Sequence, residues 1–171
     1  MTNHQLINQT SGDVEYYTPI LIVEAARRTM GGIDLDPFSS RTANNRIAAT
    51  SIYTVEDDGF AQPWFGRVFC NHPFGRTTNP RFSAKLVEEI RRGQIEALCC
   101  ITFAATSEKW FRPLLAIPQC FLTPRLNYVL PSGAVKRGVT KGSVVSYYGK
   151  DVHRFVEKFS QFGVVKLPCM K

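Results

Sequence analysis

The chain has 171 residues, enough for one compact domain, and its 44% hydrophobic and 20% charged residues exclude a disordered chain. No apolar run approaches the ~20 residues of a membrane span, and the polar start MTNHQLINQTSG has no signal-peptide pattern, so we expect no membrane partner and a protein that stays in the cytoplasm. The net charge of +7 at pH 7 favours a polyanionic partner, because lysine and arginine side chains that neutralise phosphates release counterions.

We expect residues 1–15 to form an N-terminal arm and residues 16–171 to form a single domain. Short apolar runs bounded by turn-forming residues predict the strands: 33–35, 51–54, 68–70, 95–103, 120–122, 126–130, 143–148 and 164–167. The longest run, 95–103, should be the central strand. Residues 38–45 and 56–66 are predicted to be polar loops.

Four helices are predicted from the spacing of apolar residues and from the residues that start and stop helices. The residues expected to start them are Thr18, Asn79, Ser107 and Asp151. Pro19 then stands at the first position of the first helix, and Gly93 ends the second.

Strands alternate with helices over the first two thirds of the chain, which favours a parallel sheet. The pattern then changes, because residues 126–130 and 143–148 flank a Gly- and Lys-rich connector, as two antiparallel strands do. We therefore predict an α/β fold, a doubly wound and mostly parallel twisted sheet with an antiparallel hairpin near its C-terminal edge. In such sheets, ligands bind beyond the carboxyl ends of the strands.

Three predicted strands end in polar residues. These ends are Asp34-Leu35-Asp36-Pro37, Glu56-Asp57-Asp58-Gly59 and Asn71-His72-Pro73-Phe74. Acidic residues and proline are also ordinary turn formers, and this explanation stays open for Asp57 and Asp58. It fits the third end less well, because Phe74 has no strand left in which to pack.

The tetrapeptide 71–74 has the groups needed to bind an exocyclic amino group. Pro73 keeps His72 extended, so the His72 carbonyl can lie beside the Asn71 side-chain oxygen, and the two oxygens can accept both hydrogens of an NH2 group. Phe74 offers a flat surface on which a base can stack. Accepting both hydrogens frees the nitrogen lone pair for attack on an electrophilic methyl group, without a strong base.

Several short motifs follow one another in the order known from one enzyme family. They are Tyr17-Thr18-Pro19, Asp34-Leu35-Asp36-Pro37, Asn44-Asn45, Glu56-Asp57-Asp58-Gly59, Trp64, Asn71-His72-Pro73-Phe74-Gly75 and Trp110-Phe111. In these motifs, over residues 16–148, the sequence resembles the phage-type, Dam-like DNA adenine N6-methyltransferases, which use S-adenosylmethionine. The resemblance implies a Rossmann-like class I methyltransferase fold and a phage- or prophage-encoded protein in the cytoplasm of a bacterial host.

The resemblance also implies roles for individual residues. Asn71, His72, Pro73 and Phe74 form the catalytic motif, in which the Asn71 amide and the His72 carbonyl bind the adenine amino group and Phe74 stacks on the flipped base. The residues implied to bind the cofactor are Tyr17, Thr18, Pro19, Asp34, Asp36, Asp57 and Asp58. Of the last two, Asp58 is preferred because it lies beside the flexible Gly59.

His72 departs from the family pattern, which usually has proline at this place. Because the acting group is a backbone carbonyl and Pro73 still restrains it, we expect activity to survive. Three alternatives stay open. His72 could act as a general base, the chain could be a catalytically silent nucleic-acid-binding relative, or the same chemistry could act on cytosine N4 or on adenine in RNA.

A duplex hides the N6 atom of adenine, so we expect DNA that is either double-stranded with base flipping or single-stranded. Basic residues after the motif and in the connector are predicted to contact phosphates: Arg76, Arg81, Lys136, Arg137 and Lys141. A solvated hairpin tip is the alternative for the connector. The sequence shows no separate target-recognition domain, which predicts short or relaxed specificity, and we expect a monomer or a weak homodimer. The five cysteines have no zinc-binding spacing, so no metal is predicted.

Overall fold

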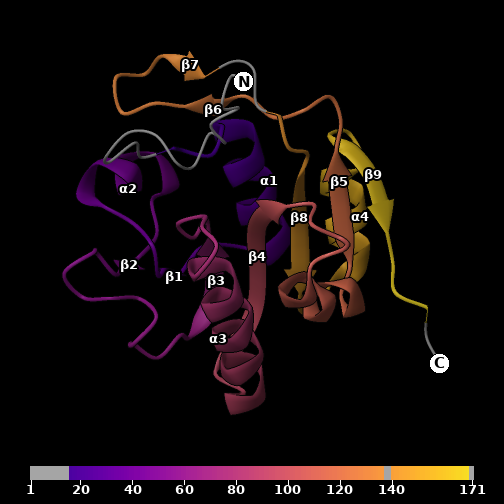
Figure 1. Cartoon of the computed structure of the whole chain (residues 1–171), viewed down its shortest axis with the longest axis horizontal. Coiled ribbons are helices and arrows are strands. Elements are labelled where there is room, and N and C mark those ends of the chain that lie inside the picture. The colour runs from indigo at the N-terminus through magenta and orange to yellow at the C-terminus, as the bar shows by residue number, and fades with distance from the viewer. Residues whose placement is uncertain (1–15, 137–139, 170–171) are drawn as a thin grey trace, which may run out of the picture.

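The computed structural model describes residues 16–136 and 140–169, and the predicted N-terminal arm, residues 1–15, lies outside this range (Figure 1). Seven strands form one mixed sheet. In spatial order they are β2 (Ser51–Ile52), β1 (Leu35–Asp36), β3 (Gly66–Cys70), β4 (Ile95–Phe103), β8 (Ser143–Tyr148), β5 (Gln119–Leu122) and β9 (Gly163–Lys166). Two short strands, β6 (Tyr128–Val129) and β7 (Val135–Lys136), pair separately.

The α/β class and the mostly parallel sheet are confirmed. Strands β2, β1, β3 and β4 are parallel to one another, whereas β8 runs antiparallel to both of its neighbours, β4 and β5, and β9 runs antiparallel to β5. The predicted central strand 95–103 is β4, the fourth of the seven strands.

The predicted hairpin between residues 126–130 and 143–148 is wrong. β6 pairs with β7, inside the connector, and β8 instead enters the main sheet between β4 and β5. The physical reason is burial, because five of the six residues of β8 are buried and a strand with two apolar faces needs cover on both.

Helices cover both faces of the sheet (Figure 1). In this view α1 (Ile20–Met30) and α4 (Val152–Phe159) lie behind the sheet, and α3 (Thr78–Arg92) and the 3-10 helix η1 (Lys109–Ala116) lie in front. Side chains alternate along β3, so Phe69 belongs to the core under α1 and Cys70 to the core under α3. In the part of the chain that the structure describes, no helix combines the length and the apolar composition that crossing a bilayer requires.

Four local predictions about helices are wrong. One concerns Ser107, because the third predicted helix is the 3-10 helix η1, which begins at Lys109 with Glu108 at its cap position. Residues 38–45, predicted as a loop, run into helix α2 (Arg41–Ile47), which Ser40 caps through its hydroxyl oxygen. Thr18 does not cap α1, whose cap position is the next residue. Asn79 lies inside the first turn of α3, and its side chain turns back to the loop that precedes the helix.

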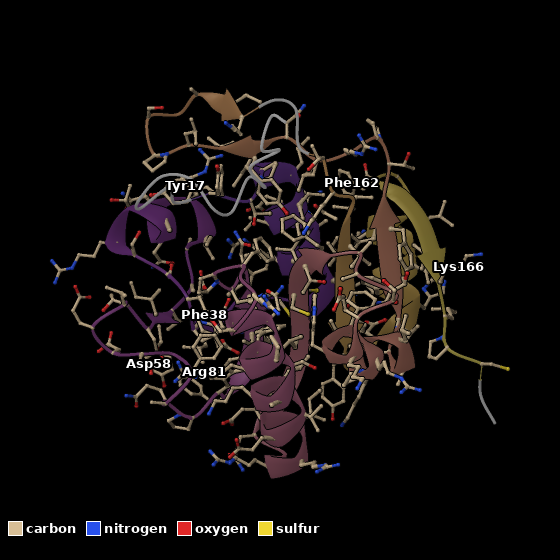
Figure 2. All side chains as sticks on the ribbon, viewed as in Figure 1. Tyr17, Phe38, Asp58, Arg81, Phe162 and Lys166 are labelled. Carbon is tan, nitrogen blue, oxygen red and sulfur yellow. The ribbon has the colours of Figure 1, made fainter. Side chains whose placement is uncertain are left out.

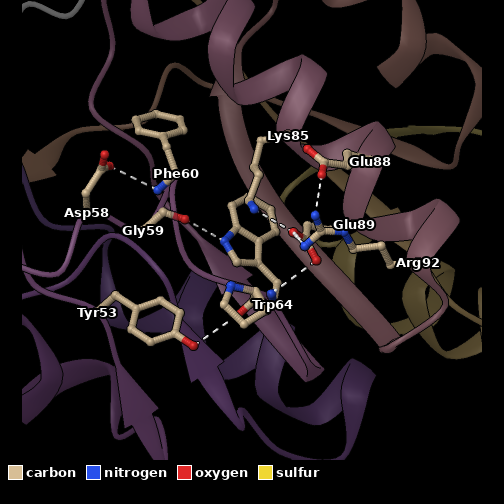
Figure 3. Close-up of polar contacts among 10 residues, drawn as sticks. Tyr53, Asp58, Gly59, Phe60, Trp64, Lys85, Glu88, Glu89 and Arg92 are labelled. Atoms are coloured by element: carbon tan, nitrogen blue, oxygen red, sulfur yellow. Dashed lines mark hydrogen bonds and ion pairs between the residues drawn. The ribbon is translucent and has the colours of Figure 1, made fainter.

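A buried ion pair on α3 fixes the loop that precedes β3 (Figure 3). The buried carboxylate of Glu89 accepts a hydrogen bond from Lys85 Nζ at 2.5 Å and from the Trp64 backbone N–H at 3.2 Å. The Trp64 indole N–H donates to the Gly59 carbonyl at 2.8 Å. Gly59 packs so closely that an added Cβ would lie 1.7 Å from the Pro37 carbonyl oxygen. These contacts hold the loop against the carboxyl end of β1.

Glu89→Gln should destabilise the fold by about 3 kcal/mol, because Lys85 would keep its charge in a buried site without its partner. The matched control is Glu88→Gln, since Glu88 is exposed on the same helix and pairs with Arg92 at 2.5 Å. This change should cost less than about 1 kcal/mol. Urea unfolding measures both losses, and equal losses in the two variants would contradict this account of the ion pair.

Candidate functional site

The predicted catalytic residues lie at the carboxyl edge of the parallel strands. β3 ends at Cys70, so Asn71 is the first residue beyond it. The carboxyl ends of the parallel strands lie at the upper edge of the sheet in Figure 1, where β6 and β7 also lie. Tyr17 pairs with Val129 of β6, and the preceding Tyr16 contacts Asn71. The structure therefore brings the predicted catalytic motif together with the segment that precedes α1.

The side-chain amide of Asn71 is fixed by one hydrogen bond. Its Nδ2 donates to the Tyr16 carbonyl at 2.9 Å, and this contact decides which end of the amide is the nitrogen. The other end, Oδ1, is buried and has no hydrogen-bond partner among the described residues. A buried acceptor without a donor costs about 1–3 kcal/mol. Asn71 thus holds an unused acceptor at the strand end, and a donor that reaches it must first displace the atoms that cover it.

His72 is 1% exposed, and its imidazole stacks on Phe82 of α3 with ring centroids 3.9 Å apart. Asn79 Oδ1 accepts the Gly75 N–H at 3.2 Å and lies 3.0 Å from His72 Nε2, so Nε2 carries the ring proton. Burial lowers the pKa of His72 to about 4, and the hydrogen bond with Asn79 opposes this shift only in part. A ring with this pKa is a poor proton acceptor at neutral pH, which argues against the general-base alternative.

The ring of Phe74 is half-buried in an aromatic row. Its centroid lies 4.4 Å from that of Phe103, the last residue of β4, and 4.9 Å from that of His72. Lys141 Nζ lies 5.3 Å from the Phe103 centroid. A predicted phosphate contact therefore lies close to the motif, and Pro73 is exposed within it.

The two acidic residues of the first strand end lie at opposite ends of β1. Asp36, its last residue, is buried and its carboxylate accepts the Phe38 N–H at 3.1 Å. Burial raises the pKa of Asp36 to about 7. Asp34 precedes β1 and binds Arg67, at the start of β3, through two contacts of 2.6 and 2.8 Å. Asp36 shares the edge of the motif, whereas Asp34 lies at the amino edge, where the Arg67 side chain holds its pKa below the usual range.

The acidic loop after β2 makes contacts of its own. Asp57 is exposed, and its Oδ2 accepts both the N–H and the hydroxyl of Thr54 at 2.8 Å. Asp58 and Arg81 lie next to one another in Figure 2 and form an ion pair of 2.8 Å. Arg81 also lies 4.3 Å from the centroid of the Phe60 ring. The structure thus joins a predicted cofactor residue to a predicted phosphate contact.

The segment before α1 presents a second unused polar atom. Thr18 is buried, and its hydroxyl has no hydrogen-bond partner in the described part of the chain. Pro19 stands at the cap position and no side chain caps the helix, so the first backbone N–H groups of α1 have no side-chain acceptor. Both features leave this helix start able to bind an anion.

Two of the remaining predicted phosphate contacts lie at the same edge. Arg76 is exposed in the turn after the motif, and Lys136 is half-buried on β7, opposite Tyr128 of β6. Arg137 lies outside the described residues.

Sequence reasoning missed three residues that contact or adjoin the motif: Tyr16, Asn79 and Thr102. Thr102 precedes the last residue of β4, is fully buried, and has a hydroxyl without a partner among the described residues. The rule that functional residues lie at strand ends could have selected Thr102, because it is the polar residue next to the end of the longest apolar run. The other two contacts join residues 55 and 7 positions apart, and no local pattern indicates them.

A groove of about 580 Å³ opens at the opposite, amino edge of the sheet. Its lining includes Arg67, Ile95, Gly149, Lys150 and Arg154. None of the described residues predicted to form the site lines it, so this groove is separate from the carboxyl edge.

No model of a known protein family matches the chain, and a search of curated proteins finds no match. The methyltransferase resemblance therefore rests on the sequence motifs. The geometry of the carboxyl edge is an observation independent of this resemblance.

The raised pKa of Asp36 predicts a pH-dependent effect of Asp36→Asn. A folded pKa of about 7, against the usual 3.8, means that the folded state binds more protons between these values, so wild type loses stability there as the pH rises. Asparagine cannot ionise, so the variant should gain about 3 kcal/mol relative to wild type between pH 4 and pH 7. Urea unfolding at each pH measures the difference in stability. Both proteins contain His72, so the effect of its titration on stability cancels in this difference.

Asp57→Asn is the control for this measurement. Hydrogen bonds from the Thr54 backbone and side chain lower the pKa of Asp57, so both states are ionised above pH 5 and the difference from wild type should stay constant. An equally constant difference for Asp36→Asn would show that its carboxyl is ionised normally.

Proposed function

We propose that this protein transfers a methyl group from S-adenosylmethionine to the N6 amino group of adenine in DNA. The observation that carries the proposal is the Asn71 amide, whose nitrogen is held by the Tyr16 carbonyl while its oxygen has no partner among the described residues. An exocyclic amino group is a donor that suits this oxygen. Phe74, a half-buried ring three residues further along, suits the base that carries such a group.

The sheet supports the fold that this function needs. The catalytic motif follows a parallel strand next to the central β4, at the edge where doubly wound sheets bind ligands. β8 runs antiparallel between β4 and β5, in keeping with a Rossmann-like class I methyltransferase sheet that is mostly parallel with antiparallel pairing near one edge. Because one fold serves many functions, the motif carries more weight than the sheet.

In the proposed reaction, Asn71 Oδ1 and the His72 carbonyl accept the two hydrogens of the adenine amino group. These contacts draw the nitrogen towards tetrahedral geometry and align its lone pair. His72 contributes its backbone, since its neutral ring is held by Phe82 and Asn79. Phe74 stacks on the extruded base. No side-chain base is required before transfer, because the cationic product amine loses its proton readily.

The residues at the carboxyl edge fit S-adenosylmethionine, which supplies an electrophilic methyl group when bound. The buried Thr18 hydroxyl and the uncapped N-terminus of α1 suit the carboxylate of its methionine half. Asp36 lies at the same edge, at the end of β1. Asp58 is engaged by Arg81, and Asp34 is held at the amino edge, so we assign the cofactor contacts first to Thr18 and Asp36.

Exposed basic side chains around the motif support DNA as the substrate. Lys141 lies beside the aromatic row, and Arg76 follows the motif directly. We propose these two as phosphate contacts that position the strand while the base is extruded. Arg81 contributes less, because the carboxylate of Asp58 neutralises it.

Asn71→Ala should lower the rate of methyl transfer by at least ~100-fold, the effect of losing one preorganised polar contact to the transition state. The affinity for S-adenosylmethionine should stay within a few-fold, since the amide contacts the substrate amino group. Labelled cofactor measures the rate, and calorimetry measures the affinity. Asn45→Ala, at an exposed position of α2, is the matched control and should behave as wild type. A fully active Asn71→Ala would refute the assignment.

Mass spectrometry of the digested nucleic acid identifies the acceptor in the same experiment. N6-methyladenine in DNA is the expected product, and N4-methylcytosine or methylated RNA would keep the chemistry and change the substrate. A wild-type protein that binds DNA and methylates none of these would instead be a silent binding module.

Thr18→Val should weaken cofactor binding about 10-fold, because it removes a hydroxyl that contacts a charged group while keeping the side-chain shape. Its stability should not fall, since the hydroxyl makes no hydrogen bond in the described structure.

Asp34→Ala should keep the cofactor affinity within about 3-fold of wild type. It should lower the stability by about 1 kcal/mol, because the ion pair with Arg67 is lost. Calorimetry measures the affinity, and urea unfolding measures the stability. If Asp34→Ala weakened cofactor binding and Thr18→Val did not, the cofactor contact would instead lie at the amino edge.

A further inference from the structure

One side chain closes the loop that carries the catalytic motif. Asn79, in the first turn of α3, accepts the Gly75 N–H through Oδ1, and the same oxygen lies 3.0 Å from Nε2 of His72. A backbone N–H can only donate, so this oxygen is an acceptor and Nε2 is the donor. The neutral His72 ring therefore has a bare Nδ1, which can only accept.

His72 Nδ1 and the Thr102 hydroxyl are both buried, and neither has a hydrogen-bond partner among the described residues. Cys70, the last residue of β3, lies opposite Cys100 of β4, so His72 lies in the loop just beyond this pair and Thr102 lies two residues further along β4. The His72 ring lies on Phe82 of α3, and Thr102 shares the face of Cys100, which α3 also covers. The His72 side chain is therefore held through Nε2 and through the face of its ring, and Nδ1 adds no contact among the described residues.

We propose that His72 is a positioning residue of the methyl transfer, an inference that rests on the proposed function. Its Nε2–H holds Asn79 Oδ1, and its ring lies on Phe82. These contacts fix the side chain, while Pro73 keeps the His72 backbone extended. Together they hold the His72 carbonyl in place as an acceptor, and the ring takes no proton from the substrate.

This role accounts for the departure from the proline of the resembled family. Proline restrains its own backbone through its ring. His72 obtains a comparable restraint from its contacts with α3, so Asn79 and Phe82 become part of the machinery that holds the motif.

Two variants separate the ring from its nitrogens. His72→Phe keeps a stacking ring and removes both nitrogens, and His72→Gln restores a donor towards Asn79. The lost Nε2 contact is expected to lower kcat about 10-fold in His72→Phe, and His72→Gln should stay within about 3-fold of wild type, while KM for DNA and the cofactor affinity stay within about 3-fold in both. His153→Phe, at an exposed position of α4, is the matched control and should leave kcat unchanged. Wild-type kcat in His72→Phe would overturn the proposal.

A double-mutant cycle tests the contact with Asn79. In the Asn79→Ala background, His72→Phe should cost at least about 5-fold less in kcat than it does in wild type, because the Nε2 contact is already lost. Equal costs in the two backgrounds would show that the side chains act independently and would also overturn the proposal.

Ring-nitrogen NMR gives a readout that does not depend on activity. We expect a protonated Nε2 and a bare Nδ1 for His72 at pH 7, with the signals assigned by their absence in His72→Phe. An active wild type whose Nδ1 is protonated, or whose ring carries two protons, rejects the positioning role alone. A wild type that methylates no base rejects the proposed function and the positioning role together.

Discussion

The parallel register of β1, β3 and β4 is the constraint on which the candidate site depends. Leu35 lies opposite Val68, and Cys70 lies opposite Cys100, so the three strands end at one edge of the sheet. A slip of one residue would exchange the faces of the sheet. Asn71 would then lose the Tyr16 carbonyl on the α1 side, and the residue after it would no longer reach α3. The register therefore places the Asn71 amide on the α1 side and the His72 ring on the α3 side.

Burial at this edge drives two ionisable groups towards neutrality from opposite directions. It raises the pKa of Asp36 to about 7 and lowers that of His72 to about 4, because each charged form is poorly solvated there. His72 is thus neutral at pH 7, and Asp36 is protonated in about half of the molecules. Hydrogen bonds are stronger in such a low-dielectric place. The edge therefore suits a neutral donor such as an aromatic amino group.

The sequence predicted the elements that depend on local pattern. The central strand 95–103, the end of α3 at Gly93 and the cap of α4 at Asp151 all follow from apolar runs and from residues with specific backbone preferences. Local pattern does not predict which strands pair when they are far apart in the sequence. The mostly apolar residues 143–148 fit either a hairpin arm or an inner strand, and only the position of β5 decides between the two.

The same division applies to the site. The motif at residues 71–74 was found because a strand end with an amide, a proline and an aromatic is chemically unusual. The partners of that motif come from Tyr16 and Asn79, whose roles depend on how distant segments meet. Asp34 and Asp36 are indistinguishable by type and nearly adjacent, and only the end of β1 on which each lies separates an ion pair from a buried carboxyl.

The free acceptor and the basic connector are mechanically linked. Tyr17 and Val129 of β6 exchange two backbone hydrogen bonds, of 2.7 and 3.0 Å, and the neighbouring Tyr16 carbonyl holds the Asn71 amide. β6 pairs with β7, which carries Lys136. The connector is therefore joined through β6 and Tyr17 to the carbonyl that orients the amide. Since Asn71 Oδ1 is covered, a displacement of this segment changes both the orientation of the acceptor and its access to a substrate.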